Sequence, residues 1–280
     1  MKIGESWSPF YGCGMKISPG CLNCYAERDM KMYGKNFNAV KLSGTLRNPE
    51  LGKKPYDKPT LIFSPPWSDW CHPQAAAFRQ KAWEAIHNSP KHTFRLLTKL
   101  PQLYPKCLPN ANPNFTSTPP LPPWGSGWDN VWLGTSVELA RYKWRIRRLQ
   151  RVPAKGRWLS IEPLLGHIKL TKKDLKGISL VVTGGESGPH ARQSKVQWFL
   201  DIRDACKNAH VAFFHKQNGN LGNPRGSRPC KCHAAWGCML LPPKTGRIYA
   251  QLPLPANIPY RRVVHLHPHR KKKTRPQPTP

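Results

Sequence analysis

Short apolar runs recur along the chain, each bounded by turn-forming residues and separated by stretches long enough for a helix. A continuous apolar run of this kind is typical of a strand that is buried on both faces of a parallel sheet. A further short strand is expected near Trp7. The runs cover residues 61–63, 94–98, 131–137, 157–161, 179–183 and 211–214.

Helix-like segments lie between these runs, at residues 75–87, 140–151 and 196–209. The alternation predicts repeated βα units, and right-handed crossovers would wrap such units around a common axis. The expected strands fall one short of the eight that close a TIM barrel. We therefore predict an α/β fold, a full or partial (βα) TIM-like barrel, formed by residues 1–225.

Three regions depart from the alternation. Residues 105–130 are rich in Pro and Asn, which predicts a long surface insertion within the barrel. Residues 226–260 contain cysteines and a histidine between loop-like flanks, and are expected to form a separate C-terminal segment. Residues 261–280 hold seven Lys or Arg, three His and no acid, which predicts a disordered basic tail.

The balance of charge narrows the choice of partner. The chain has 45 Lys and Arg against 14 Asp and Glu, a formal net charge of +31. Such a charge attracts polyanions and makes binding depend steeply on salt. We therefore expect nucleic acid, either DNA or RNA, as the partner. An anionic membrane surface is disfavoured because the sequence shows no basic amphipathic helix.

The N-terminal residues lack the apolar segment of a secretory signal, and no apolar stretch is long enough to span a bilayer. We therefore expect a cytoplasmic location, which would be the host cytoplasm if the gene is carried by a phage. A reducing compartment also changes how the nine cysteines are interpreted. There, clustered cysteines bind metal more often than they form disulfides.

Three cysteines, Cys13, Cys21 and Cys24, lie within twelve residues and are separated by a Ser-Pro-Gly turn. Their thiols can converge on one centre without help from distant sequence. Three cysteines would leave one iron of a four-iron cluster open to another ligand. A zinc site would need a fourth ligand from elsewhere in the chain. We predict an iron–sulfur site, with zinc or unliganded cysteines as the alternatives.

A second group, Cys230, Cys232, His233 and Cys238, supplies three thiols and one imidazole within nine residues. This donor set suits zinc. The adjacent positions of Cys232 and His233 are cramped for binding one ion. An auxiliary iron–sulfur cluster and the absence of metal are therefore kept as alternatives.

Acidic residues are scarce, so their positions are informative. In a βα barrel the carboxyl ends of the strands form the active-site face. A carboxylate there can bind an amine, a hydroxyl or a cation, or act as an acid or base. The alternative is that these groups cap helices or pair with surplus cations. Seven polar residues follow an expected strand in this way: Asp69, Lys99, Glu138, Glu162, Glu186, Lys216 and Gln217.

The segment around the first cysteines also carries a family resemblance. Trp7-Ser8-Pro9, Gly12-Cys13 and Ser18-Pro19-Gly20-Cys21-Leu22-Asn23-Cys24-Tyr25-Ala26-Glu27 resemble the opening of phage and bacterial three-cysteine-motif proteins. That family is similar to radical S-adenosyl-L-methionine (radical SAM) enzymes, including spore photoproduct lyase. Asn218 stands where the family usually has tryptophan, and the C-x7-C-x2-C spacing is longer than the common C-x3-C-x2-C. The resemblance continues at 68–69, 96–99, 131–138, 162–166, 184–192 and 213–217.

The resemblance implies a chemistry for the cysteine loop. A 4Fe-4S cluster on Cys13, Cys21 and Cys24 would bind S-adenosyl-L-methionine through its open iron. An electron donor would reduce it, and a 5′-deoxyadenosyl radical would then take hydrogen from the substrate. Gly184-Gly185-Glu186 resembles the motif that holds the methionine amino group of this cofactor.

Roles for individual residues follow from their places after the expected strands and, for Gly184-Gly185-Glu186, also from the resemblance. We expect cofactor binding by Ser136, Glu138, Gly184, Gly185 and Glu186, catalysis by Glu162, Lys99 and Lys216, and substrate binding by Asp69 and Gln217. The predicted function is a radical SAM-type enzyme that modifies or repairs a base in nucleic acid. The alternative is a zinc-stabilised nucleic-acid-binding protein without catalysis.

Overall fold

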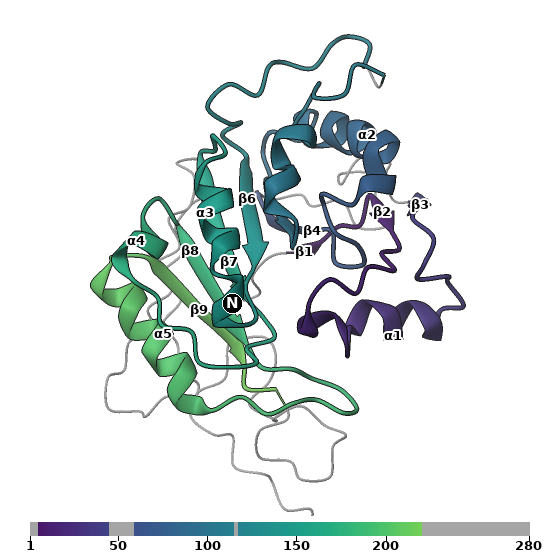
Figure 1. The fold of residues 1–280 in the computed structure, drawn as a ribbon. Helices are drawn as coiled ribbons and strands as arrows, with labels where there is room; N and C mark the ends of the chain where they lie inside the picture. Colours follow the sequence, from purple (N-terminus) through teal and green to yellow (C-terminus); the bar gives the residue numbers. More distant parts are fainter. Residues whose placement is uncertain (1–4, 45–58, 115–116, 220–280) are drawn as a thin grey trace, which may run out of the picture.

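The structure is a computed structural model and describes residues 5–44, 59–114 and 117–219 (Figure 1). The predicted C-terminal segment 226–260, with Cys230, Cys232, His233 and Cys238, lies outside the described residues. So does the predicted basic tail, 261–280. The metal, structure and boundaries assigned to them stay predictions.

Seven strands form one sheet in which every neighbouring pair is parallel. The sheet curls into a half-barrel whose edge strands are β1 and β9 (Figure 1). The prediction of a partial barrel is confirmed, and the described residues do not close it. In spatial order the strands are β1 (Glu5–Ser6), β4 (Leu61–Ser64), β5 (Thr93–Thr98), β6 (Val131–Ser136), β7 (Gly156–Ile161), β8 (Leu180–Gly184) and β9 (Ala212–Gln217).

The expected helices are present, and the segment 140–151 divides into a short 3-10 turn, η5, followed by α3. None of the described helices combines the length and the apolar character that crossing a membrane requires. The α-helices are α1 (Tyr25–Met32), α2 (Ala76–His87), α3 (Trp144–Gln150), α4 (Lys172–Leu175) and α5 (Val196–Asn208). The 3-10 turns are η1 (Pro19–Cys21), η3 (Pro73–Ala75), η4 (Pro101–Lys106) and η5 (Ala140–Tyr142). A separate antiparallel pair is formed by β2 (Phe10–Tyr11) and β3 (Lys41–Leu42).

The two faces of the curled sheet have different neighbours, because successive side chains of a strand point to opposite faces. On the outer face, Leu133 and Val181 belong to one core with Ile86 of α2, Ile146 of α3 and Phe199 of α5. The inner face carries a second, smaller cluster of Trp132, Trp158, Leu180 and Val182, packed against Phe63, Leu97 and Phe214. Burial on both faces explains why the strands appear in the sequence as continuous apolar runs.

The two inner-face tryptophans lie against glycines of neighbouring strands. Trp158 is paired in register with Gly134, and Trp132 with Gly156. A Cβ at Gly134 would lie 2.3 Å from Nε1 of Trp158, and one at Gly156 would lie 2.4 Å from Cδ1 of Trp132. Only glycine therefore leaves room for these indoles, which fill the inner face below the carboxyl ends of the strands.

The predicted insertion, 105–130, is irregular as expected, but it is not confined to the surface. Trp124 is buried, and Trp128 packs against the main core. Their rings lie 5.5 Å and 5.4 Å from the ring of Trp83 in α2, between ring centroids. The Pro-rich composition hid this role because the buried side chains follow neither a helical nor a strand period.

We expect Gly134→Ala to lower the free energy of unfolding by about 1–3 kcal/mol, because the added methyl overpacks the Trp158 indole. Gly44→Ala is the matched control, since a Cβ at Gly44 meets no atom within 4 Å. Urea unfolding of both variants measures the difference. Equal stability of the two variants would contradict the close packing at Gly134.

Candidate functional site

The polar residues that follow the strands all lie at one edge of the sheet, which we call the carboxyl edge. A parallel sheet brings the carboxyl ends of its strands together, so residues far apart in sequence become neighbours there. Asp69 follows β4, Lys99 follows β5, Glu138 follows β6, Glu162 follows β7, Glu186 follows β8, and Lys216 and Gln217 end β9.

Residues 13–24, the three-cysteine loop, are bonded to this edge at separate points. The Ser18 hydroxyl donates to Oε1 of Glu138 at 2.7 Å, after β6. Asn23 Nδ2 donates to Oε2 of Glu186 at 3.1 Å, after β8. Arg192 Nη2 donates to the carbonyl oxygen of Pro19 at 2.8 Å. The loop is therefore fixed against the loops that follow two different strands.

The first cysteine is positioned by the backbone. Its amide donates to the Phe37 carbonyl at 2.7 Å, and its carbonyl contacts Nε2 of His72 at 2.8 Å. The preceding Gly12 has φ +94°, and a Cβ there would lie 2.1 Å from the carbonyl oxygen of Ala39. Glycine is thus required just before Cys13, both for its conformation and for space.

The three thiols lie near enough to one another for Cys21 and Cys24 to affect the pKa of Cys13. Cys21 is buried, and Cys13 and Cys24 are half-buried beside the apolar cluster around Met30. The pKa of Cys13 is raised to about 12, mainly by burial, with a smaller contribution from the charges of Asp69, Cys21 and Cys24, against a backbone hydrogen bond from Met15 that lowers it. Such a thiol is protonated at neutral pH, so metal binding there would release its proton.

The donor set can be tested against the two predicted metals. Among the described residues there is no group of three His, Cys, Asp or Glu side chains placed to hold a metal ion. The number of thiols suits a four-iron cluster, which takes each cysteine on a separate iron and leaves one iron open. A closed zinc site would need a fourth ligand. The metal assigned to Cys13, Cys21 and Cys24 stays a prediction.

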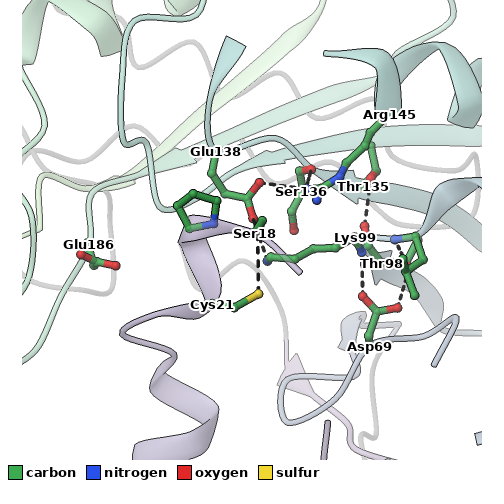
Figure 2. A network of polar contacts seen from close by, with 12 residues as sticks. Ser18, Cys21, Asp69, Thr98, Lys99, Thr135, Ser136, Glu138, Arg145 and Glu186 are labelled. Carbon is green, nitrogen blue, oxygen red and sulfur yellow. Dashed lines mark hydrogen bonds and ion pairs between the residues drawn. The ribbon is translucent and has the colours of Figure 1, made fainter. Parts of the chain in front are cut away.

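Glu138 is the centre of the largest polar network at the edge (Figure 2). Its carboxylate is fully buried, with Nη1 of Arg145 at 2.8 Å and Nζ of Lys99 at 3.3 Å. Burial alone would raise the pKa of Glu138, but Lys99, Arg145 and the Ser18 hydroxyl outweigh it and the pKa is lowered. Burial would likewise lower the pKa of Lys99, but the Glu138 carboxylate outweighs it and the pKa is raised. Both groups are therefore charged at neutral pH.

The same network reaches a predicted metal ligand. The Ser18 hydroxyl that donates to Glu138 also lies 3.6 Å from Sγ of Cys21 (Figure 2). A Cβ at Gly20 would lie 2.7 Å from Cγ of Glu138, so glycine lets the loop rest on this side chain. Glu138 thus supports the position of Cys21, a role that the sequence alone did not indicate.

Asp69 and Glu186 are also engaged with the protein. Asp69 accepts the amides of Cys71 at 2.9 Å and Lys99 at 2.7 Å, together with the Thr98 hydroxyl. Both carboxylate oxygens of Glu186 accept from the Arg192 guanidinium. Burial would raise the pKa of Glu186, but the hydrogen bonds from Arg192 outweigh it and lower the pKa. The binding roles expected for Asp69 and Glu186 stay predictions.

Glu162 and Lys216 form the more accessible pair. Their side chains are 21% and 57% exposed, and Lys216 Nζ lies 3.5 Å from Oε1 of Glu162. A Cβ at Gly184 would lie 2.2 Å from this Oε1, so the carboxylate lies directly over the glycine. Of the expected catalytic residues, these two are best placed to meet a ligand at the mouth of the half-barrel.

The remaining predicted residues contact the protein. Ser136 is buried, and its carbonyl oxygen accepts from Arg145 at 3.0 Å. Gln217 Nε2 donates to the Gly185 carbonyl at 2.6 Å, which joins the end of β9 to the loop after β8. Lys99 is only 20% exposed and faces Glu138. Their expected roles toward cofactor, substrate and catalysis stay predictions.

Sequence reasoning did not single out Arg145, and it used Ser18 and Arg192 only as parts of family motifs. A chain with 45 Lys and Arg offers no signal that marks one arginine as the partner of a given carboxylate. Arg145 could have been suspected only from its position on α3 beside the inward-facing Ile146, because an arginine on a buried face needs a counter-charge.

Fold and site together define an α/β half-barrel protein whose three-cysteine loop is bonded over the carboxyl ends of the strands. The chain belongs to the family described as "Protein of unknown function (DUF5131)", whose family model matches residues 2–273. No curated protein matches the chain. The resemblance to phage and bacterial three-cysteine-motif proteins stays a prediction.

Solved structures of spore photoproduct lyase are similar to the chain. A mutant with bound AdoMet and dinucleoside spore photoproduct is 12% identical, with a TM-score of 0.40 over 73% of this chain and 61% of that chain. Another mutant of that lyase is 12% identical, with a TM-score of 0.40 over 72% and 60%. The chain therefore matches about three-fifths of the length of these proteins, and at this similarity no function follows from the likeness.

We expect Glu138→Gln to lower the free energy of unfolding at pH 7 by about 3–5 kcal/mol, because Lys99 and Arg145 lose their buried counter-charge. Glu162→Gln is the matched control. Its carboxylate is partly exposed, and its loss should cost less than about 1 kcal/mol. Urea unfolding of both variants measures the difference, and equal losses would contradict the central role of Glu138.

The same substitution should change the pH dependence of stability. The pKa of Glu138 is lowered in the folded chain from its ordinary value of 4.5. Its charge therefore stabilises the fold above that value, and this stabilisation is lost as the pH falls from about 5 through the folded pKa. We expect the wild type to lose more stability than Glu138→Gln over this window. Parallel pH profiles would contradict the expectation.

Proposed function

We propose that the protein is an iron–sulfur, radical SAM-type enzyme that modifies or repairs a base in nucleic acid. The observation that carries the proposal is the bonding of the three-cysteine loop over the carboxyl edge, with the accessible Glu162–Lys216 pair on the same edge. This arrangement puts a set of soft ligands and an acid–base pair on one face of the barrel, where such folds carry their chemistry.

Cys13, Cys21 and Cys24 would hold the 4Fe-4S cluster. When bound, the cluster would pass an electron to S-adenosyl-L-methionine and split it to give a 5′-deoxyadenosyl radical. Glu138 and Ser18 hold the loop that bears Cys21 at the edge. Lys99, charged and next to Glu138, supplies positive charge near Cys21.

The proposed cofactor site extends to the loop after β8. Because Gly184 and Gly185 have no side chain, the Glu162 carboxylate and the Asn218 carbonyl oxygen lie close against their backbone, and these glycines would border the cofactor. The Glu186 carboxylate already accepts hydrogen bonds from the Arg192 guanidinium. It would also accept a hydrogen bond from the methionine amino group of the cofactor. An external electron donor would supply each reduction.

On the substrate side, Glu162 and Lys216 have the exposure and the opposite charges needed to hold or move a proton on a base. Asp69 and Gln217 would lie at the same edge and contact the substrate. They also fix neighbouring loops there, because Asp69 accepts the Lys99 amide and Gln217 donates to the Gly185 carbonyl. The net charge of +31 supports a polyanionic substrate, and nucleic acid is the one that also offers a base to modify.

A second candidate is a metal-stabilised nucleic-acid-binding protein without catalysis. It is favoured by the engagement of Asp69, Glu138 and Glu186 in internal hydrogen bonds and ion pairs. In that case the carboxylates only join loops to one another. The two candidates differ in whether the cysteine loop carries iron and whether the protein cleaves S-adenosyl-L-methionine.

We expect the anaerobically reconstituted protein to be brown, with absorption near about 400 nm from cysteine-to-iron charge transfer. Cys21→Ala should lose the colour and the bound iron. Cys206→Ala is the matched control, because Cys206 is also a buried free thiol but lies on α5. A colourless protein with one zinc held by the three-cysteine loop would favour the binding protein instead.

With S-adenosyl-L-methionine and dithionite, the protein should release 5′-deoxyadenosine, and Cys24→Ala should not. Glu162→Gln should keep this cleavage but form modified nucleic acid about 100-fold more slowly or worse, because a proton acceptor is lost. Both products can be quantified by mass spectrometry. An intact cluster that gives no cleavage with DNA or RNA present would reject the radical assignment.

A further inference from the structure

Positive charge is concentrated in one stretch of the described chain. Residues 139–179 contain twelve Lys or Arg but only two acids, Glu162 and Asp174. Glu162 belongs to the carboxyl edge, and Asp174 is buried and bonded to Lys143 and Thr171. Neither acid therefore lies exposed among the cations of the outer surface.

Nine of these cations are exposed, and one of them, Lys155, pairs with Asp129 at 3.3 Å. We call the other eight the α3–α4 basic surface. None of the eight forms an ion pair with any acid in the part of the chain that the structure describes. They are Arg141, Arg147, Arg148, Arg151, Lys169, Lys172, Lys173 and Lys176.

The two elements of this surface are joined to one another. Gln150 at the end of α3 donates from Nε2 to the carbonyl oxygens of Lys173 at 3.0 Å and Lys176 at 2.9 Å. Lys143 before α3 donates to the carbonyl oxygen of Lys169 at 2.8 Å. The cations of this surface thus lie on neighbouring elements with fixed positions.

Folding does not require this grouping. The inward side of α3 is anchored by Ile146 and Leu149, which are buried in the main core. Arg147 on α3 and Arg151, the residue that follows its end, are four positions apart, and like charges at that spacing repel one another. Scattered lysines would serve solubility equally well, whereas cations grouped on one face without acids are typical of polyanion-binding surfaces.

We infer that the α3–α4 basic surface binds the sugar–phosphate backbone of double-stranded nucleic acid. The inference rests on the proposed function, in which nucleic acid is the partner. It places a binding surface for the nucleic-acid backbone apart from the carboxyl edge. Among the described residues of this surface, Trp144 is the one exposed large aromatic residue, and it is 42% exposed. A row of aromatics for stacking unpaired bases is therefore missing from it. A guanidinium group can donate two hydrogen bonds to the oxygens of one phosphate. The contacts would therefore be to the sugar–phosphate backbone and independent of the base sequence.

The test compares two full-length variants that lose the same four positive charges. The surface variant carries Arg147→Gln, Arg148→Gln, Lys172→Gln and Lys173→Gln. The matched control carries Lys31→Gln, Lys81→Gln, Lys106→Gln and Lys195→Gln, at exposed positions on other elements. Binding of a short labelled DNA duplex is followed by fluorescence anisotropy at several salt concentrations. Urea unfolding first establishes that both variants are folded.

We expect the surface variant to bind at least about tenfold more weakly at low salt. Its log–log salt slope should be shallower by about 2 to 4, since each lost phosphate contact removes about 0.9. The control should keep nearly the wild-type slope. Equal losses in the two variants, or no loss in either, would overturn the inference, because net charge rather than this surface would then govern binding.

Two further outcomes are informative. If the surface variant lost binding only to anionic phosphatidylserine vesicles and kept its duplex affinity, the surface would bind membrane and the inference would be wrong. If the wild-type chain bound neither DNA nor RNA duplex, nor single strands, the proposed function would fail together with the inference. Wild-type binding with equal losses in both variants would remove the inference alone.

Discussion

The buried carboxylate of Glu138 is the interaction on which the carboxyl edge depends. Removing such a group from water is costly, so it is stable there only if its oxygens are fully paired. Lys99 after β5, Arg145 on α3 and Ser18 in the three-cysteine loop provide those partners. One charge therefore holds together two strand ends, an outer helix and the loop that carries the cysteines.

This requirement divides the acids of the edge into two kinds. Asp69, Glu138 and Glu186 have their oxygens occupied by amides, hydroxyls and cations of the protein, and they fix the loops in place. Glu162 keeps partial exposure and a single lysine neighbour at the longer distance of 3.5 Å. A rigid frame with one less restrained acid is a reasonable basis for chemistry, because the reacting group must exchange partners while its surroundings stay fixed.

The scarcity of acids also shapes the outer surface. Most described acids are engaged with neighbouring cations or backbone groups, as at Glu138, Asp174 and Glu186. The eight cations of the α3–α4 basic surface therefore face solvent without an ion-pair partner among the described residues. The few acids thus find partners at the carboxyl edge, and the surplus cations leave a positive charge on the outside of the barrel.

The order and kind of the elements could be predicted from the sequence, because apolar runs and helical periods are local patterns. The alignment of Asp69, Glu138, Glu162 and Glu186 on one edge followed from the same parallel order. The sequence did not reveal which of many arginines pairs with Glu138, nor that Trp124 in an irregular segment would be buried. Those outcomes depend on contacts between distant segments, and only the packing of α3 on β6 and of the insertion on α2 selects them.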